Sequence, residues 1–193
     1  SSNGSNIYIN TPNGNYGSGF VSKLNNQGEP IWAFEAWARD LAITDIEIFN
    51  EQLYLSGSFR TWTSGYPAVI SDVSGNTYNI FNPGIGLAFL AQYSTDGYQN
   101  WNVSIGNEGS GQSASTSISD LIIDNQGEPI ICGSYSDGFI TFYSTNGINL
   151  YTSNSNSQDG FIMKYNSLGV PNWSNEWGGN GNPVSYTHLR AHE

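Results

Sequence analysis

The sequence predicts an all-β protein, and more specifically a β-propeller fragment of about two and a half blades. One stretch occurs three times, at residues 19–32, 88–101 and 160–173, and each copy ends on a tryptophan. These tryptophans lie 69 and 72 residues apart, and self-similarity at a nearly fixed period indicates a repeat architecture. Only 11% of the residues are charged and 23 are glycine, a composition typical of turn-rich β-structure.

Each copy of the repeated stretch has the pattern of a β-hairpin. In the first copy Phe20 and Leu24 alternate with Val21 and Lys23, which predicts a strand with two different faces. A turn follows whose last residue is glycine, where a hairpin commonly needs a positive φ. We expect the final tryptophans to pack one blade onto the next rather than to bind a ligand. The repeated phenylalanine, glycine and tryptophan positions are Phe20, Phe89, Phe161, Gly28, Gly97, Gly169, Trp32, Trp101 and Trp173.

A second hairpin is predicted after the tryptophan, at residues 44–59 and again at 119–135. Ile46 and Ile48 alternate with acidic residues there, which indicates a half-buried strand. Equivalent positions in the two hairpins, which we expect to be structural, are Asp45 and Asp120, and Gly57 and Gly133. A propeller blade takes roughly 40 to 50 residues. The remaining residues around Gly75 and Gly147 therefore predict an added hairpin per blade, at its outer edge or one rim, bracketed by polar loops at 61–67 and 152–159.

The repeat divides the chain into units of about 1–72 and 73–143 and a partial unit at 144–183. Because the chain opens inside a unit, we expect it to be a piece of a longer protein. Residues 184–193 break the repeat and resemble translated sequencing-adapter sequence, so we expect a non-native tail. Both histidines lie in that tail. No helix of useful length is expected, and residues 32–41 are the only window where one could lie.

Charge and hydropathy exclude several classes of partner. The net charge of −11 argues against nucleic acid, because phosphate binding needs lysine and arginine, of which there are five. The same charge disfavours anionic membrane surfaces, and no apolar run is long enough to span a bilayer. Low charge with high polarity favours an extracellular or cell-surface location.

The residues available for chemistry are few. Without histidine outside the tail, Ser-His-Asp and Cys-His arrangements and the usual zinc sites are excluded. Asp45 and Asp120 could form a glycosidase pair, but an aspartate at such a position more often caps a turn. We expect no catalytic residue, no cofactor and no metal. The candidate ligand-binding residues are aromatics expected in exposed loops, where they would either stack on sugars or cover blade edges: Trp37, Trp62, Tyr66 and Tyr98.

These motifs resemble the SBBP-type β-propeller repeats of large secreted bacterial proteins. The family pattern is a strand with Phe and Lys, a turn ending in Gly, then Trp, Gly-Gly and a later strand with Tyr and Gly. The matching residues are Phe161, Lys164, Gly169, Trp173, Gly178 and Gly179 in the last copy and Phe20, Lys23, Gly28, Trp32, Tyr54 and Gly57 in the first. The middle copy departs from the pattern at Gln92, where the family has lysine. The resemblance implies a scaffold without shared catalytic residues.

The sequence therefore predicts a non-catalytic structural or binding region of a secreted or cell-surface bacterial protein. Its partners would be a glycan or protein ligand and the remaining blades of the same parent chain. One alternative is part of a propeller-type carbohydrate-active hydrolase or lyase that uses paired carboxylates. Another keeps the repeats but stacks them as an open solenoid or a row of β-sandwich units, because a period alone does not fix closure.

Overall fold

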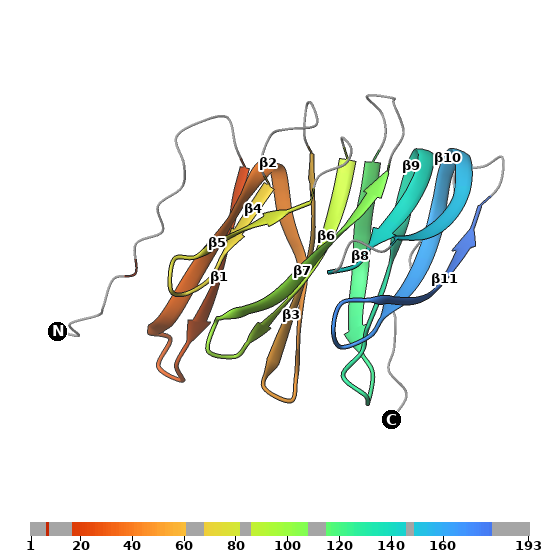
Figure 1. The fold of residues 1–193 in the computed structure, drawn as a ribbon. Helices are drawn as coiled ribbons and strands as arrows, with labels where there is room; N and C mark the ends of the chain where they lie inside the picture. The colour runs from red at the N-terminus through yellow and green to blue at the C-terminus, as the bar shows by residue number, and fades with distance from the viewer. Residues whose placement is uncertain are drawn as a thin grey trace.

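The computed structural model describes residues 7, 17–60, 68–81, 86–107, 115–145 and 149–178. Within these ranges the chain forms eleven strands and no helix, and every strand pairing is antiparallel (Figure 1). The all-β prediction is confirmed. Among the described strands no closed ring forms, so the propeller and its number of blades stay predictions.

The first sheet has four strands. β1 (Gly17–Leu24) pairs with the beginning of β2 (Pro30–Phe49), β2 pairs with β4 (Ala68–Ser71), and β4 pairs with β5 (Thr77–Ile80). The β1–β2 turn closes on Gly28 with φ of 80°, so the predicted positive φ is confirmed. The hairpin expected around Gly75 is present as β4–β5, and it extends this sheet beyond β2.

Strand β2 carries the chain out of the first sheet. It bends at Asp40, where φ is 49° and the register shifts, and its second half pairs with β3 (Gln52–Arg60). The window at 32–41 is therefore strand and not helix. Burial follows the period of two that a strand requires, with Phe34, Ala36 and Ala38 buried and the residues between them partly exposed.

The other seven strands form a second sheet that curls into a half-barrel. They are β3, β6 (Gly86–Ser94), β7 (Gln99–Asn107), β8 (Ser115–Ile123), β9 (Pro129–Tyr143), β10 (Asn149–Tyr165) and β11 (Pro171–Trp177). Strands β9 and β10 are long: residues 129–136 of β9 pair with β8, whereas residues 140–142 pair with β7. Strands β3, β6 and β7 lie in the middle of the molecule, and β8 to β11 lie at the end opposite the first sheet (Figure 1).

The sequence repeat reappears as a repeat of strand pairings. Hairpins β1–β2, β6–β7 and β10–β11 are its three copies. Strand β3 pairs with β6 so that Gly57 faces Phe89, and β9 pairs with β10 so that Gly133 faces Phe161. Likewise β4 pairs with β2 as the end of β9 pairs with β7. Equivalent sequences therefore occupy equivalent places.

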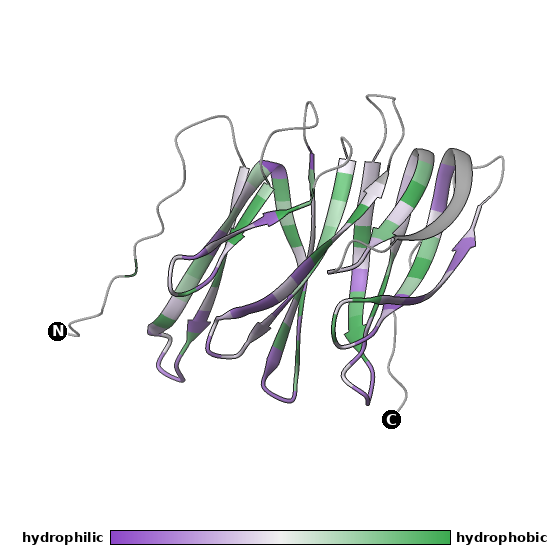
Figure 2. Ribbon diagram, viewed as in Figure 1, coloured by the Kyte–Doolittle hydropathy of each residue, from purple (hydrophilic) through white to green (hydrophobic). Residues whose placement is uncertain are grey.

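Two apolar layers separate these groups of strands. The first layer lies between the first sheet and one face of β3 and β6, and includes Phe34, Leu55 and Phe89. The second lies between the opposite face of β3 and β6 and the far strands, and includes Tyr54 and Phe142. Because β6 contributes to both layers, all its residues except Ser94 are buried. Hydrophobic residues concentrate along the strands and hydrophilic ones at the hairpin turns (Figure 2).

Candidate functional site

A polar cleft opens where β3 ends and where β6 and β8 begin. Its volume is about 410 Å³, within the range of small-ligand pockets. Most of its lining is polar, and the lining residues are Asp40, Ser58, Phe59, Arg60, Gly86, Ser115, Thr116 and Ser117. Because these residues come from four strands that are distant in sequence, no single motif reveals the cleft.

Charged residues meet at one side of the cleft because of the bend in β2. Arg39 and Arg60 are register partners on β2 and β3, and together they are two of the five lysines and arginines of the chain. Asp40 follows Arg39, and its carboxylate lies 3.4 Å from the Arg39 guanidinium. Asp40 also has a left-handed backbone, with φ of 49°, a conformation that non-glycine residues adopt mainly in turns and at functional sites.

Hydroxyl groups line the β8 side of the cleft. Ser115 pairs its hydroxyl with Ser136 of β9 at 3.1 Å, and Ser117 pairs with Ser134 at 3.2 Å. Thr116 lies between them, and its buried Oγ1 has no hydrogen-bond partner among the described residues. A buried hydroxyl without a partner is unfavourable, and a ligand group that bonded this hydroxyl would remove that cost.

Among the described residues that line the cleft, one carries a carboxylate, Asp40. Glycoside hydrolysis usually needs two carboxyl groups on either side of the scissile bond. The described lining is suited to hydrogen bonding and charge pairing with a polar ligand.

The two equivalent aspartates lie elsewhere, and the structure brings them together. Asp45 accepts a hydrogen bond from the Leu121 amide at 3.0 Å, and Asp120 accepts one from the same amide at 3.2 Å. Both aspartates lie at register shifts inside β2 and β8, so the expectation that they cap turns is wrong. Each carboxylate accepts a hydrogen bond from the backbone amide of the following residue, which is Ile46 for Asp45 and Leu121 for Asp120. A register shift interrupts the hydrogen bonds between strands, so these amides need another acceptor.

Glu47 lies close to both aspartates. Burial raises the pKa of its carboxyl above the ordinary value, and the charges of Asp45 and Asp120 raise it further. Across the described ranges no group of three or more His, Cys, Asp and Glu side chains could hold a metal ion. The carboxylates of Asp45, Glu47 and Asp120 form a cluster of like charge.

The structure describes two of the four candidate loop aromatics, Trp37 and Tyr98, and they lie in different environments. Trp37 is half-buried within β2 and pairs with Val69 of β4, so the expectation of an exposed loop ring is wrong for this residue. Its strand gains a neighbour that the sequence alone does not reveal. Tyr98 is 53% exposed next to the turn between β6 and β7, as expected. Trp62 and Tyr66 lie outside the described residues.

Two of the repeated tryptophans, Trp32 and Trp101, contact the next copy of the repeated hairpin. The indole N–H of Trp32 donates to the Thr95 carbonyl at 3.3 Å, and that of Trp101 donates to the Ser167 carbonyl at 3.1 Å. Their rings pack against the turn glycines Gly97 and Gly169. Trp173, in the last copy, is 38% exposed. The tryptophans Trp32 and Trp101 therefore serve as contacts between neighbouring groups of strands.

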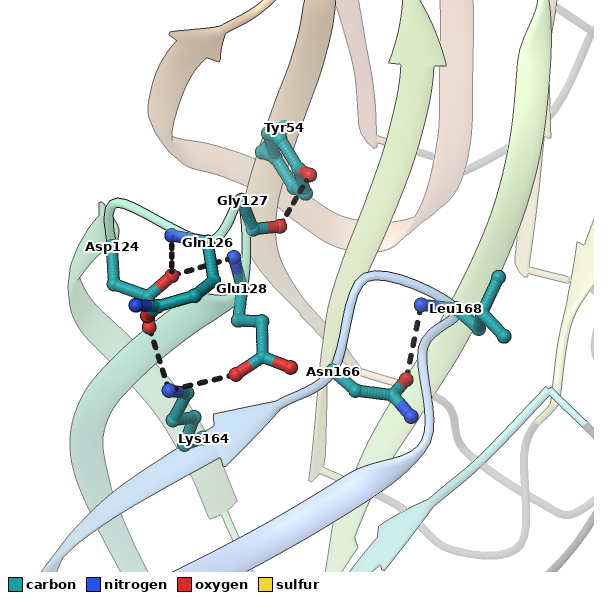
Figure 3. Close-up of polar contacts among 8 residues, drawn as sticks. All are labelled: Tyr54, Asp124, Gln126, Gly127, Glu128, Lys164, Asn166 and Leu168. Atoms are coloured by element: carbon teal, nitrogen blue, oxygen red, sulfur yellow. Dashed lines mark hydrogen bonds and ion pairs between the residues drawn. The ribbon is translucent and has the colours of Figure 1, made fainter.

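An ion-paired turn lies beside the second apolar layer (Figure 3). Lys164 of β10 points toward the β8–β9 turn, with its ammonium 2.6 Å from Asp124 and 2.7 Å from Glu128. Burial raises the pKa of Asp124, but hydrogen bonds from Lys164 and the turn amides outweigh it and hold that pKa below the ordinary value. The hydrogen bonds that Lys164 donates to the two carboxylates raise its own pKa. The hexapeptide Asn-Gln-Gly-Glu-Pro-Ile at residues 125–130 of this turn also occurs at residues 26–31, but no motif in it predicts the ion pair with Lys164.

Comparison with known proteins finds no family model and no curated protein that matches the chain. The resemblance to SBBP-type repeats therefore rests on the quoted motifs alone. No helix that could cross a membrane occurs in the part of the chain that the structure describes.

Proposed function

We propose that the chain is a non-catalytic scaffold and binding region, built of β-propeller-type blades, from a secreted or cell-surface bacterial protein. Common blades are four-stranded antiparallel sheets. In this proposal the second half of β2 with β3, β6 and β7 is one blade, and β8, β9, β10 and β11 supply the next. The repeated pairings and the two apolar layers support this arrangement.

The polar cleft carries the binding proposal. Its hydroxyls can both donate and accept hydrogen bonds, Arg60 only donates, and the Asp40 carboxylate only accepts. A polyhydroxylated ligand matches this mixture, because every sugar hydroxyl is itself both donor and acceptor. A sugar hydroxyl would also satisfy Thr116 Oγ1. The proposed ligand is accordingly one end or a short segment of a glycan.

The test is binding of the whole chain to a panel of neutral and acidic oligosaccharides, followed by calorimetric titration of the best ligand. We expect Thr116→Val and Arg60→Met each to weaken binding at least tenfold. Glu29→Gln is the matched control, because Glu29 is exposed in the β1–β2 turn and does not line the cleft. Binding that survives both cleft variants unchanged would contradict this site, and a chain that binds no member of the panel would contradict the glycan proposal.

The hydrolase alternative has one observation in its favour, the convergence of Asp45 and Asp120 on the Leu121 amide. It is tested by release of reducing ends from a panel of polysaccharides. The non-catalytic proposal expects no release by the unmodified chain. Release that disappears in both Asp45→Asn and Asp120→Asn would instead establish the hydrolase.

A further inference from the structure

The first copy of the repeat lacks a neighbour that both later copies have. Strand β6 pairs with β3 on one side and β7 on the other, and the end of β10 pairs with β9 and β11. Among the described strands, β1 pairs with β2 alone. One edge of β1 therefore has no partner strand within the described ranges.

Side-chain exposure follows this difference. Phe20 of β1 is 65% exposed, whereas the equivalent Phe89 and Phe161 are 0% and 2% exposed. Leu24 is 56% exposed, whereas the residues at its position in the later copies are fully buried tyrosines. In those copies each phenylalanine lies across a glycine of the neighbouring strand, at Gly57 or Gly133.

A second observation points to the same place from the other side. On β2, Ile46 is 49% and Ile48 is 65% exposed. Their equivalents on β8 are Leu121, which is fully buried, and Ile123, which packs against the second apolar layer. Strands β2 and β3 contact β8, so the preceding hairpin lies against that strand.

Between β1 and the second half of β2 lies a largely apolar cavity of about 150 Å³. Val21 and Lys23 of β1 line it together with Trp32, Ile46 and Ile48 of β2. The exposed isoleucines therefore border a half-open apolar pocket next to β1.

We propose that the β1 edge is a strand-acceptor site, occupied by a β-hairpin with the pattern of residues 119–135. Its second strand pairs antiparallel with β1 and places a glycine opposite Phe20, as Gly133 lies opposite Phe161. The two strands of the hairpin also cover Ile46 and Ile48, as β2 and β3 cover β8. Addition of a strand to a sheet edge is a common mode of peptide binding, with main-chain hydrogen bonds supplying affinity.

Charge selects this hairpin pattern over that of residues 44–60. Lys23 is equivalent to Lys164, which pairs with Asp124 and Glu128 in the turn of residues 124–128. The tight turn of the other hairpin, at Asn50 and Glu51, provides one carboxylate instead of two. The preferred occupant therefore carries an acidic turn beside Lys23 and a glycine beside Phe20.

The probe is a synthetic peptide of residues 117–136 with Cys132→Ser. It is titrated into the whole chain at a protein concentration where light scattering shows the protein to be monomeric. We expect saturable one-to-one binding and slower amide exchange in residues 17–24. Phe20→Ala in the protein weakens binding at least tenfold. Phe81→Ala is the matched control, because Phe81 is 59% exposed and follows β5, which lies at the opposite edge of the first sheet from β1. Lys23→Met weakens binding to the unmodified peptide but not to a peptide carrying Asp124→Asn and Glu128→Gln.

Absence of saturable binding overturns the proposal. So does binding that Phe20→Ala leaves unchanged, or binding that protects a segment other than residues 17–24. The outcome is independent of the glycan proposal, because the polar cleft and the β1 edge share no lining residue. An oligosaccharide that fills the cleft therefore leaves peptide affinity unchanged.

Discussion

Single residues of the repeat act through close contact. At Gly57 and Gly133 a phenylalanine ring of the neighbouring strand occupies the space that a side chain would need. At Gly57 a Cβ atom would overlap the ring of Phe89 and the carbonyl of Ala42. The sequence marks both glycines as equivalent, but only the strand register shows which ring each one accommodates.

Gly57→Ala is predicted to lower the free energy of unfolding by about 1–3 kcal/mol, because overpacking forces the ring and backbone to shift. Urea denaturation measures the effect. Gly160→Ala is the control, since the atoms nearest its Cβ would lie 3.7 and 3.8 Å away in ordinary contact. Equal effects of the two substitutions would contradict the proposed contact.

Lys164→Met is predicted to lower the free energy of unfolding by about 1 kcal/mol at neutral pH, with a characteristic dependence on pH. The pKa of Asp124 is lowered in the folded protein, so its stabilisation is present above roughly pH 4 and is lost as pH falls through the folded pKa. The pKa of Lys164 is raised, so its stabilisation is present below roughly pH 10 and is lost as pH rises through the folded value.

The difference between Lys164→Met and the unmodified chain should therefore be largest from about pH 5 to pH 10 and should shrink on both sides. Denaturant melts across this range measure it. Lys23→Met is the control, because Lys23 donates to the Thr95 carbonyl and not to a carboxylate. A difference for Lys164→Met that stays constant at acidic pH would show that the ion pair contributes nothing.

At the scale of elements, the added hairpin β4–β5 depends on one side chain. Asp72 accepts hydrogen bonds from the Ser74 amide at 2.9 Å and hydroxyl at 2.7 Å, from the Tyr78 hydroxyl at 2.7 Å, and from Asn76. Burial raises the pKa of Asp72, but these donors outweigh it and hold that pKa below the ordinary value. The turn therefore stabilises an ionised carboxylate.

Asp72→Ala is predicted to lower the free energy of unfolding by about 2 kcal/mol, because several donors lose a charged acceptor. Hydrogen exchange should also become faster in residues 68–80 before it does in β6. Asp96→Ala, in the exposed β6–β7 turn, is the control, and we expect it to change stability by less than about 0.5 kcal/mol. Unchanged protection of β4 and β5 in Asp72→Ala would argue that Asp72 does not hold this hairpin.

Strands with alternating apolar residues could be predicted from the sequence. Polar strands, which are stabilised mainly by backbone hydrogen bonds to a neighbouring strand, could not. The hairpins ending on Trp32 and Trp101 follow from their alternation and their turn glycines. The polar stretch at 152–159, expected as a loop, instead lies within β10. Its backbone pairs with β9, and those hydrogen bonds outweigh its weak strand propensity. The polar cleft was missed because its lining comes from strands brought together only by folding.

At the scale of the whole molecule, apolar surface remains uncovered at the first copy of the repeat. The exposed side chains Phe20, Leu24, Ile46 and Ile48 adjoin the edge strand β1. Unpaired edges next to apolar side chains favour association. We therefore predict that the isolated chain self-associates as its concentration rises.

The double substitution Phe20→Lys and Ile48→Lys should reduce this association. Sedimentation velocity over a range of protein concentrations measures it. Lysine at Tyr98, an equally exposed aromatic in a turn, provides the control. A chain that remains monomeric at high concentration without these substitutions would show that the β1 edge is already protected.

We propose that the repeats form equivalent groups of strands arranged around an axis, and distances between spin labels test this arrangement. Gln27, Asp96 and Leu168 occupy the same exposed turn position in the three copies, so labels can be attached in pairs in a Cys132→Ser background. A propeller arrangement predicts equal distances for the pairs 27–96 and 96–168, and a 27–168 distance clearly shorter than their sum. Unequal neighbouring distances would contradict the equivalence of the copies, and a 27–168 distance equal to the sum would establish an open row instead of a propeller.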